Sequence, residues 1–210
     1  MPIIINTVLF DRAMRSLRIG IDVDGVVTEI IEPIVKFLYG RGIKVPSYED
    51  TTDYNLSKVW RCSTQEMVRR VFDFYASKEF LELQPVLGVA KAFARLFPPH
   101  EGYSITSRPD IVENITKDFF DRHLNGRCRE IHHLGEFGGN GSKETKGSLA
   151  KKLKLDFFVE DALHNAEEIA SHGVPVLLMT QPWNRDRIVP QGVIRVNSWS
   201  DVLRYVEDYK

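Results

Sequence analysis

The chain has 210 residues, 43% of them hydrophobic, and a formal net charge of -1. A near-neutral chain of this length can bury a core of its own, and it lacks the basic surface by which a nucleic-acid polymer would be bound. Its cysteines, Cys62 and Cys128, predict neither a disulfide framework nor a zinc site. No apolar run approaches the roughly 18 residues of a membrane-spanning helix, and no export signal is recognisable. We therefore expect no membrane partner and a cytoplasmic location.

Short apolar runs alternate with amphipathic stretches along the first half of the chain. The first run, residues 17–22, is predicted to be a buried strand. Helical periodicity predicts helices over 29–39, 63–76 and 85–96, with a polar, turn-rich stretch at 41–60.

From residue 102 onward, strands and helices alternate regularly. The strands are expected at 102–106, 130–134, 155–160, 174–179 and 193–196. The helices are expected at 109–123, 145–153, 162–171 and 198–208. This alternation predicts a parallel α/β sheet covered on both faces. Because such sheets bind ligands at the carboxyl ends of their strands, we expect the chemistry there.

The first strand is followed by two aspartates, Asp22 and Asp24, and then by Gly25. An extended backbone would place both carboxylates on one side, where their mutual repulsion favours a cation between them. Gly25 permits a sharp turn directly afterwards. The alternative interpretation is an Asp-Gly turn with a solvated acid beside it.

The second and fourth strands of the chain also end in polar residues. Thr106 and Ser107 could hold an anion together with nearby backbone N–H groups, or one of them could cap the next helix. Glu160 and Asp161 end an apolar strand, where carboxylates are costly to bury unless they face a cleft or a metal. Asp161 could also cap the helix that follows it.

Lys146 stands at the start of a predicted helix. The helix dipole disfavours a cation at that end unless an anion lies nearby. An ordinary surface lysine is the alternative, and Lys143 is a rival candidate for contacting an anion. We prefer Lys146 because the apolar helical pattern follows it directly.

Together these residues resemble the four motifs of the haloacid dehalogenase (HAD) superfamily. The segment 22–28 resembles the first motif, Thr106 the second, Lys146 the third and the pair 160–161 the fourth. The order and the gaps agree with that family. The resemblance implies a Rossmann-like parallel sheet flanked by helices, with a small helical cap inserted after the first strand. The implied boundaries are a core over 17–31 and 85–210, a cap over 32–84 and an N-terminal extension of unknown role over 1–16.

Three features are similar to the 5'(3')-deoxyribonucleotidase-like group within this superfamily, which also includes uncharacterised nucleotidases. They are the helical cap, the Thr-Ser-Arg-Pro turn at 106–109 and the Gln-Pro-Trp-Asn-Arg segment at 181–185. The resemblance implies a hydrolase that cleaves phosphoric monoesters.

The resemblance also implies roles for individual residues. Asp22 would attack phosphorus and become an aspartyl phosphate, and Asp24 would act as general acid and then as general base. Mg²⁺ would be held by the carboxylates of Asp22 and Asp161 and by the backbone carbonyl of Asp24. Glu160 would contact the metal ligands or reach the metal through a water molecule. The phosphoryl oxygens would be held by two further residues, Thr106 and Lys146.

The substrate is expected to be a small phosphorylated metabolite. Ser107, Arg108, Trp60 and Tyr54 are candidate substrate-binding residues, and the two aromatic side chains could stack on a nucleobase. The leading hypothesis is a Mg²⁺-dependent nucleotidase acting on (deoxy)nucleoside monophosphates. A sugar-phosphate or other metabolite phosphatase and a catalytically silent phosphate-binding protein are the alternatives. A homodimer is compatible with the sequence, which specifies no oligomeric state.

Overall fold

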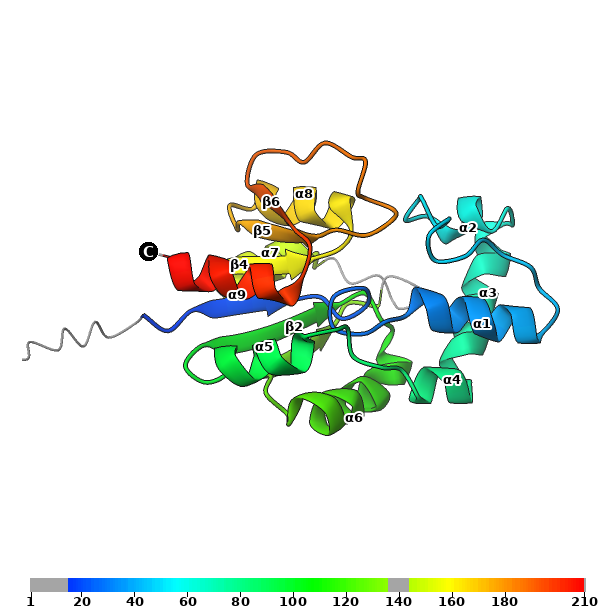
Figure 1. The fold of residues 1–210 in the computed structure, drawn as a ribbon, viewed down its shortest axis with the longest axis horizontal. Helices are drawn as coiled ribbons and strands as arrows, with labels where there is room; N and C mark the ends of the chain where they lie inside the picture. The colour runs from blue at the N-terminus through cyan, green and yellow to red at the C-terminus, as the bar shows by residue number, and fades with distance from the viewer. Residues whose placement is uncertain (1–14, 136–143, 210) are drawn as a thin grey trace, which may run out of the picture.

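The computed structural model describes residues 15–135 and 144–209 (Figure 1). Its 6-stranded sheet has the order β3-β2-β1-β4-β5-β6, and every neighbouring pair is parallel. The strands are β1 (Arg18–Ile21), β2 (Glu101–Thr106), β3 (Glu130–His133), β4 (Phe157–Glu160), β5 (Val176–Met179) and β6 (Val193–Val196). Each strand lies within a predicted range or extends it by one residue, so the predicted parallel α/β sheet is confirmed.

Helices cover both faces of this sheet. On one face lie α5 (Val89–Leu96), α6 (Glu113–Leu124) and α9 (Trp199–Asp208), and on the other lie α7 (Lys146–Lys152) and α8 (Leu163–Ser171). The alternation of side chains along β4 explains this arrangement, because Phe157 and Val159 join one hydrophobic cluster whereas Phe158 joins the other. None of the helices in the described part of the chain has the length and apolar character needed to span a bilayer.

Two helices begin later than their sequence patterns predict. The helix predicted at 29–39 is α1 (Ile31–Gly40), and the helix predicted at 85–96 begins only at Val89. The reason is that the segments 27–29 and 84–86 run side by side and hydrogen-bond to each other. Their backbone groups are therefore engaged between segments and are not available for helix formation.

Two short helices are not predicted from the sequence pattern. They are α2 (Leu56–Val59), inside the turn-rich stretch, and α4 (Lys78–Leu81). The side-chain oxygens of Asn55 and Ser77 cap them by accepting backbone N–H groups. The helix predicted at 109–123 begins as a short 3-10 turn, η1 (Asp110–Val112), before α6.

The helices α1, α2, α3 (Thr64–Tyr75) and α4 lie beyond the carboxyl edge of the sheet (Figure 1). Aromatic side chains pack these helices together, since Phe74 contacts Phe37 and Phe80 edge to face with ring centroids 5.4 and 5.5 Å apart. This group corresponds to the helical cap inferred from the resemblance. The exact boundaries remain a prediction: core at 17–31 and 85–210, cap at 32–84, extension at 1–16.

Candidate active site

The loop after β1 carries Asp22. Its backbone N–H donates to the carbonyl of Val159 (2.9 Å), which continues the β1–β4 pairing and holds Asp22 at the carboxyl edge of the sheet. Gly25 then turns the chain with a φ of 78°, a left-handed conformation that glycine adopts without strain. A Cβ at this position would lie 2.2 Å from Oδ2 of Asp161. Glycine therefore lets the first loop approach the acidic end of β4 closely.

Three buried carboxylates meet at this edge of the sheet. Asp22, Glu160 and Asp161 have carboxylate oxygens within 4.8 Å of one another, and no more than 5% of each residue is exposed. Nζ of Lys146 lies 3.0 Å from Oδ1 of Asp22 and 2.8 Å from Oε2 of Glu160. Since Lys146 is the cation that pairs with this cluster among the described residues, excess negative charge remains in a buried place.

The protonation behaviour of the cluster reflects this excess. Burial raises the pKa of Asp22 to about 8, with the charge of Glu160 adding to the effect and Lys146 opposing it. Burial and the charge of Glu160 also hold the pKa of Asp161 well above its usual range. Burial alone would lower the pKa of Lys146, but the neighbouring carboxylates of Asp22 and Glu160 hold it well above its ordinary value. The donor set fits a hard divalent cation, which binds carboxylate oxygens and would offset the repulsion.

The metal-free protein is expected to lose stability as the pH rises. For Asp22 the folded-state pKa lies above the ordinary value, so its stabilising contribution is complete below pH 3.8 and is lost as the pH rises toward about 8. Mg²⁺ at about 100 times its dissociation constant should raise the melting temperature at pH 8 by about 5–10 °C. Thermal unfolding with EDTA or Mg²⁺ at pH 5 and pH 8 measures this. An equal metal effect at both pH values would contradict the expectation.

Two alternative roles considered for strand-end residues are wrong. The N-cap of α8 is Ala162, and its backbone N–H donates to Oε1 of Glu160 (3.1 Å), so Asp161 does not cap that helix. Neither η1 nor α6 receives a side-chain cap from Thr106 or Ser107, because extended chain separates both residues from these helices. Both hydroxyls therefore stay at the end of β2, beside the cluster.

Lys146 is not an ordinary surface lysine, since only 2% of it is exposed. Thr145 is the N-cap of α7 and accepts from the backbone N–H of Ser148 (3.1 Å), which fixes the helix turn that carries Lys146. The rival candidate, Lys143, lies outside the described residues. The choice between the two lysines for contacting phosphate therefore remains a prediction.

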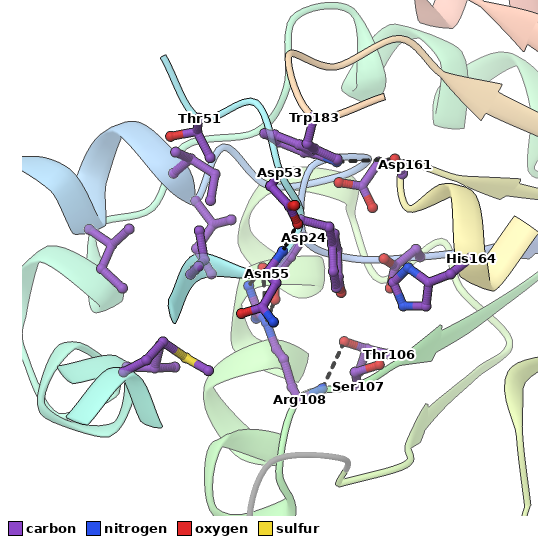
Figure 2. Close-up of a pocket in the computed structure, with 18 of the residues that line it drawn as sticks. Asp24, Thr51, Asp53, Asn55, Thr106, Ser107, Arg108, Asp161, His164 and Trp183 are labelled. Carbon is purple, nitrogen blue, oxygen red and sulfur yellow. Dashed lines mark hydrogen bonds and ion pairs between the residues drawn. The ribbon is translucent and has the colours of Figure 1, made fainter. Parts of the chain in front are cut away.

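A cavity of about 380 Å³ lies between the acidic end of the sheet and the helices α1 and α3, and Figure 2 shows residues that line it, Asp24 and Asp161 among them. Predicted site residues line its floor and walls: Asp22, Asp24, Tyr54, Thr106, Ser107, Arg108 and Asp161. The side chains that line its far end, toward α1 and α3, are mainly apolar: Ile30, Ile31, Ile34, Met67, Val71 and Tyr75. The cavity thus joins a charged end to an apolar chamber.

Trp60 does not belong to this cavity. It directly follows α2, only 6% of it is exposed, and it packs in the hydrophobic core next to a second cavity within the segment 44–61. An indole packed there cannot stack on a base in the first cavity, which corrects the expectation from sequence. Tyr54 does line the first cavity, with its ring centroid 4.6 Å from that of His164.

Side chains of the segment 181–185 hydrogen-bond to the loops that follow β1 and β4, both of which carry site residues. Nε1 of Trp183 and Nδ2 of Asn184 donate to the backbone carbonyl of Asp161, at 3.1 and 2.7 Å. Nε2 of Gln181 donates to the backbone carbonyl of Gly25 (2.7 Å). Trp183 also lines the cavity (Figure 2). The place of this segment just after β5, at the carboxyl edge, is the sequence signal from which its role could be inferred.

Solved structures of similar fold are HAD-like hydrolases. One from Streptococcus pneumoniae is 15% identical, with a TM-score of 0.63 over 90% of this chain and 98% of that one. A HAD-family hydrolase from Deinococcus radiodurans with bound phosphate and sodium has a TM-score of 0.64 at 14% identity, over 92% and 97%. YfnB from Bacillus subtilis, bound to magnesium, has a TM-score of 0.63 at 13% identity, over 91% and 99%. These similarities show that the chain has the fold of HAD-family hydrolases.

The family described as "5' nucleotidase, deoxy (Pyrimidine), cytosolic type C protein" matches residues 15–208, and the chain belongs to this family. "Putative nucleotidase BH1399" from Halalkalibacterium halodurans is 28% identical over 196 residues, which cover 93% of this chain and 95% of the relative. "Nucleotidase CA_C3379" from Clostridium acetobutylicum is 26% identical over 195 residues, with 92% and 95% covered. The resemblance inferred from the sequence is confirmed at the level of superfamily and family.

Proposed function

We propose that the protein is a Mg²⁺-dependent phosphomonoesterase that hydrolyses (deoxy)nucleoside monophosphates through an aspartyl phosphate on Asp22. The observation that carries this proposal is the acidic cluster with its paired lysine at one end of a cavity whose other end is mainly apolar. The family and the names of its relatives agree with it.

In the proposed reaction a carboxylate oxygen of Asp22 attacks phosphorus, while Lys146 holds Oδ1 of the same carboxylate. Asp24 protonates the leaving oxygen and then takes a proton from the water that hydrolyses the intermediate. We assign Thr106 and Ser107 to the binding of phosphoryl oxygens. The Oγ of Ser107 is buried and has no hydrogen-bond partner among the described residues, so it is available to donate to an oxygen of a bound phosphate.

The metal would be held by the carboxylates of Asp22 and Asp161 and by the carbonyl of Asp24. Mg²⁺ supplies charge neutralisation for the phosphoryl group and for the buried acids. Glu160 is already engaged, because its carboxylate accepts from Lys146, from the Ala162 N–H and from the side chain of Asn165. We therefore propose that Glu160 orients Lys146 and supports the metal site from behind.

The apolar end of the cavity favours a flat, weakly polar leaving group. Tyr54 and Trp183 offer aromatic surface, and Asp53 and Asn55 offer a few polar groups for its edge. A polyhydroxylated sugar would leave many hydroxyls facing aliphatic side chains without partners. This contrast favours a nucleoside over a sugar as the leaving group.

Nucleoside diphosphates are expected to be poor substrates. Among the described residues that line the cavity, Arg108 is the only lysine or arginine, and its charge is paired with that of Asp24. A second phosphate would therefore be buried without a cation. We expect phosphate release from nucleoside monophosphates to exceed that from the diphosphates and from sugar phosphates by at least about tenfold in kcat/KM. A panel in which sugar phosphates rank first would contradict the nucleotidase proposal while leaving the phosphatase mechanism intact.

The cytoplasm is the proposed location. The family description contains the words "cytosolic type", and both cysteines, Cys62 and Cys128, are free thiols, as expected in a reducing compartment. The homodimer stays a prediction, which light scattering of the purified protein would test.

A further inference from the structure

Arg108 lines the cavity but is buried, and its guanidinium is already engaged by neighbouring side chains. Only 2% of the residue is exposed. Its Nη1 donates to Oγ1 of Thr116 on α6 (3.1 Å), and its guanidinium carbon lies 5.0 Å from the ring centroid of Phe80 on α4. Its Nε and Nη2 face Asp24. Direct binding of substrate by Arg108 stays a prediction, and its contacts support a second role through Asp24.

The two oxygens of the Asp24 carboxylate are held unequally. Oδ1 accepts from Nη2 of Arg108 (2.6 Å), from Nε of the same arginine (3.2 Å) and from the hydroxyl of Thr28 (2.9 Å). Oδ2 accepts from Nε alone among the described residues, at 3.0 Å. Thr28 in turn accepts from Nη2 of Arg108 (3.1 Å), so the three side chains form a closed network. Oδ1 is thus saturated, and Oδ2 retains acceptor capacity.

We propose that Arg108 is a positioning residue that, together with Thr28, anchors Oδ1 of Asp24 and leaves Oδ2 as the oxygen that transfers protons. The inference rests on the proposed function, in which Asp24 is the acid and base. Arg108 is itself fixed by α6 and α4, so the guanidinium is a rigid fork, and its planar geometry sets the orientation of the carboxylate.

Two proton transfers follow from this arrangement. As the bond from Asp22 to phosphorus forms, the bond from phosphorus to the leaving oxygen breaks, and the proton on Oδ2 of Asp24 passes to that oxygen. Water then attacks phosphorus, its proton passes to Oδ2, and the bond from phosphorus to Asp22 breaks to release phosphate. An acid that is held at hydrogen-bond distance from the reacting oxygen, about 2.6–3.2 Å, transfers protons faster than a freely rotating one.

The test is the dependence of kcat/KM on the leaving group in Arg108→Lys and Thr28→Val. Lysine keeps the positive charge but lacks the planar guanidinium that donates to Asp24 from two nitrogens. Valine has nearly the shape of threonine but lacks the hydroxyl that donates to Oδ1. For a nucleoside 5'-monophosphate, whose alkoxide must be protonated, we expect Arg108→Lys to lower kcat/KM by about 10–100-fold. For p-nitrophenyl phosphate, whose phenolate leaves without a proton, we expect a loss below about threefold. Thr28→Val should show the same selectivity with a smaller loss.

The control is Arg95→Lys, which alters an exposed arginine paired with Glu207 and should change turnover of neither substrate. Equal losses on both substrates would overturn the proposal and indicate a structural role, and a rise in KM without a change in kcat would indicate substrate contact. If the wild type hydrolyses other alkyl phosphates but no nucleotide, the nucleotidase proposal fails, and the comparison is made with the best alkyl substrate. Crystal structures of wild type and Arg108→Lys decide the positioning independently of turnover, since Asp24 should change orientation in the variant.

Discussion

Asp22→Asn is expected to reduce turnover by at least about 10⁴-fold while leaving the protein folded. An amide oxygen is a poor nucleophile and cannot form the aspartyl phosphate that the proposed mechanism requires. The backbone of residue 22 is held by its hydrogen bond to Val159, which the substitution does not touch. Steady-state phosphate release and thermal unfolding measure the two effects.

The same substitution should not destabilise the metal-free protein at pH 8. It replaces by a neutral amide a buried carboxylate whose pKa is raised by burial and by the charge of Glu160. A matched control is Asp73→Asn, which breaks an exposed ion pair with Arg69 and should leave turnover within about twofold. Retention of substantial turnover in Asp22→Asn would refute Asp22 as the nucleophile.

Lys146→Met is expected to impair both stability and turnover. The variant would leave Asp22 and Glu160 without their common cation in a fully buried place. Removal of one partner from a buried ion pair costs about 3–5 kcal/mol, which corresponds to a fall of about 10 °C in melting temperature for a chain of this size. Turnover should fall by about 10²–10³-fold, because the transferred phosphoryl group also loses a cation.

Two comparisons separate these effects. Lys151→Met removes an exposed lysine from the same helix and should change neither property. Mg²⁺ should restore part of the lost stability of Lys146→Met, since it also neutralises Asp22, but it should not restore turnover. Wild-type turnover in Lys146→Met would instead direct attention to Lys143 as the lysine that contacts phosphate.

The sequence was sufficient to predict the order of the strands and of the longer helices, and the location of the charged site. Strand and helix periods are local properties, and parallel strands place their carboxyl ends at one edge. The side chains at or just after the ends of β1, β2 and β4, such as Asp22, Thr106 and Asp161, therefore had to lie near one another. The cap of α3 is equally local, because the side chain of Ser63 accepts from the backbone N–H of Glu66, three residues further on.

The tertiary structure alone decided how these side chains are paired. Arg108, predicted only as a candidate substrate ligand, also pairs with Asp24, a residue 84 positions away in the sequence, because the chain between them folds back to bring them together. Trp60 enters the core, whereas Trp183 enters the cavity, although both are aromatic residues in irregular segments. The later start of α5 has the same origin, since the segments 27–29 and 84–86 pair with each other. Periodicity records only what neighbouring residues prefer, whereas these contacts depend on which distant segments meet, and no local pattern in a single sequence encodes that.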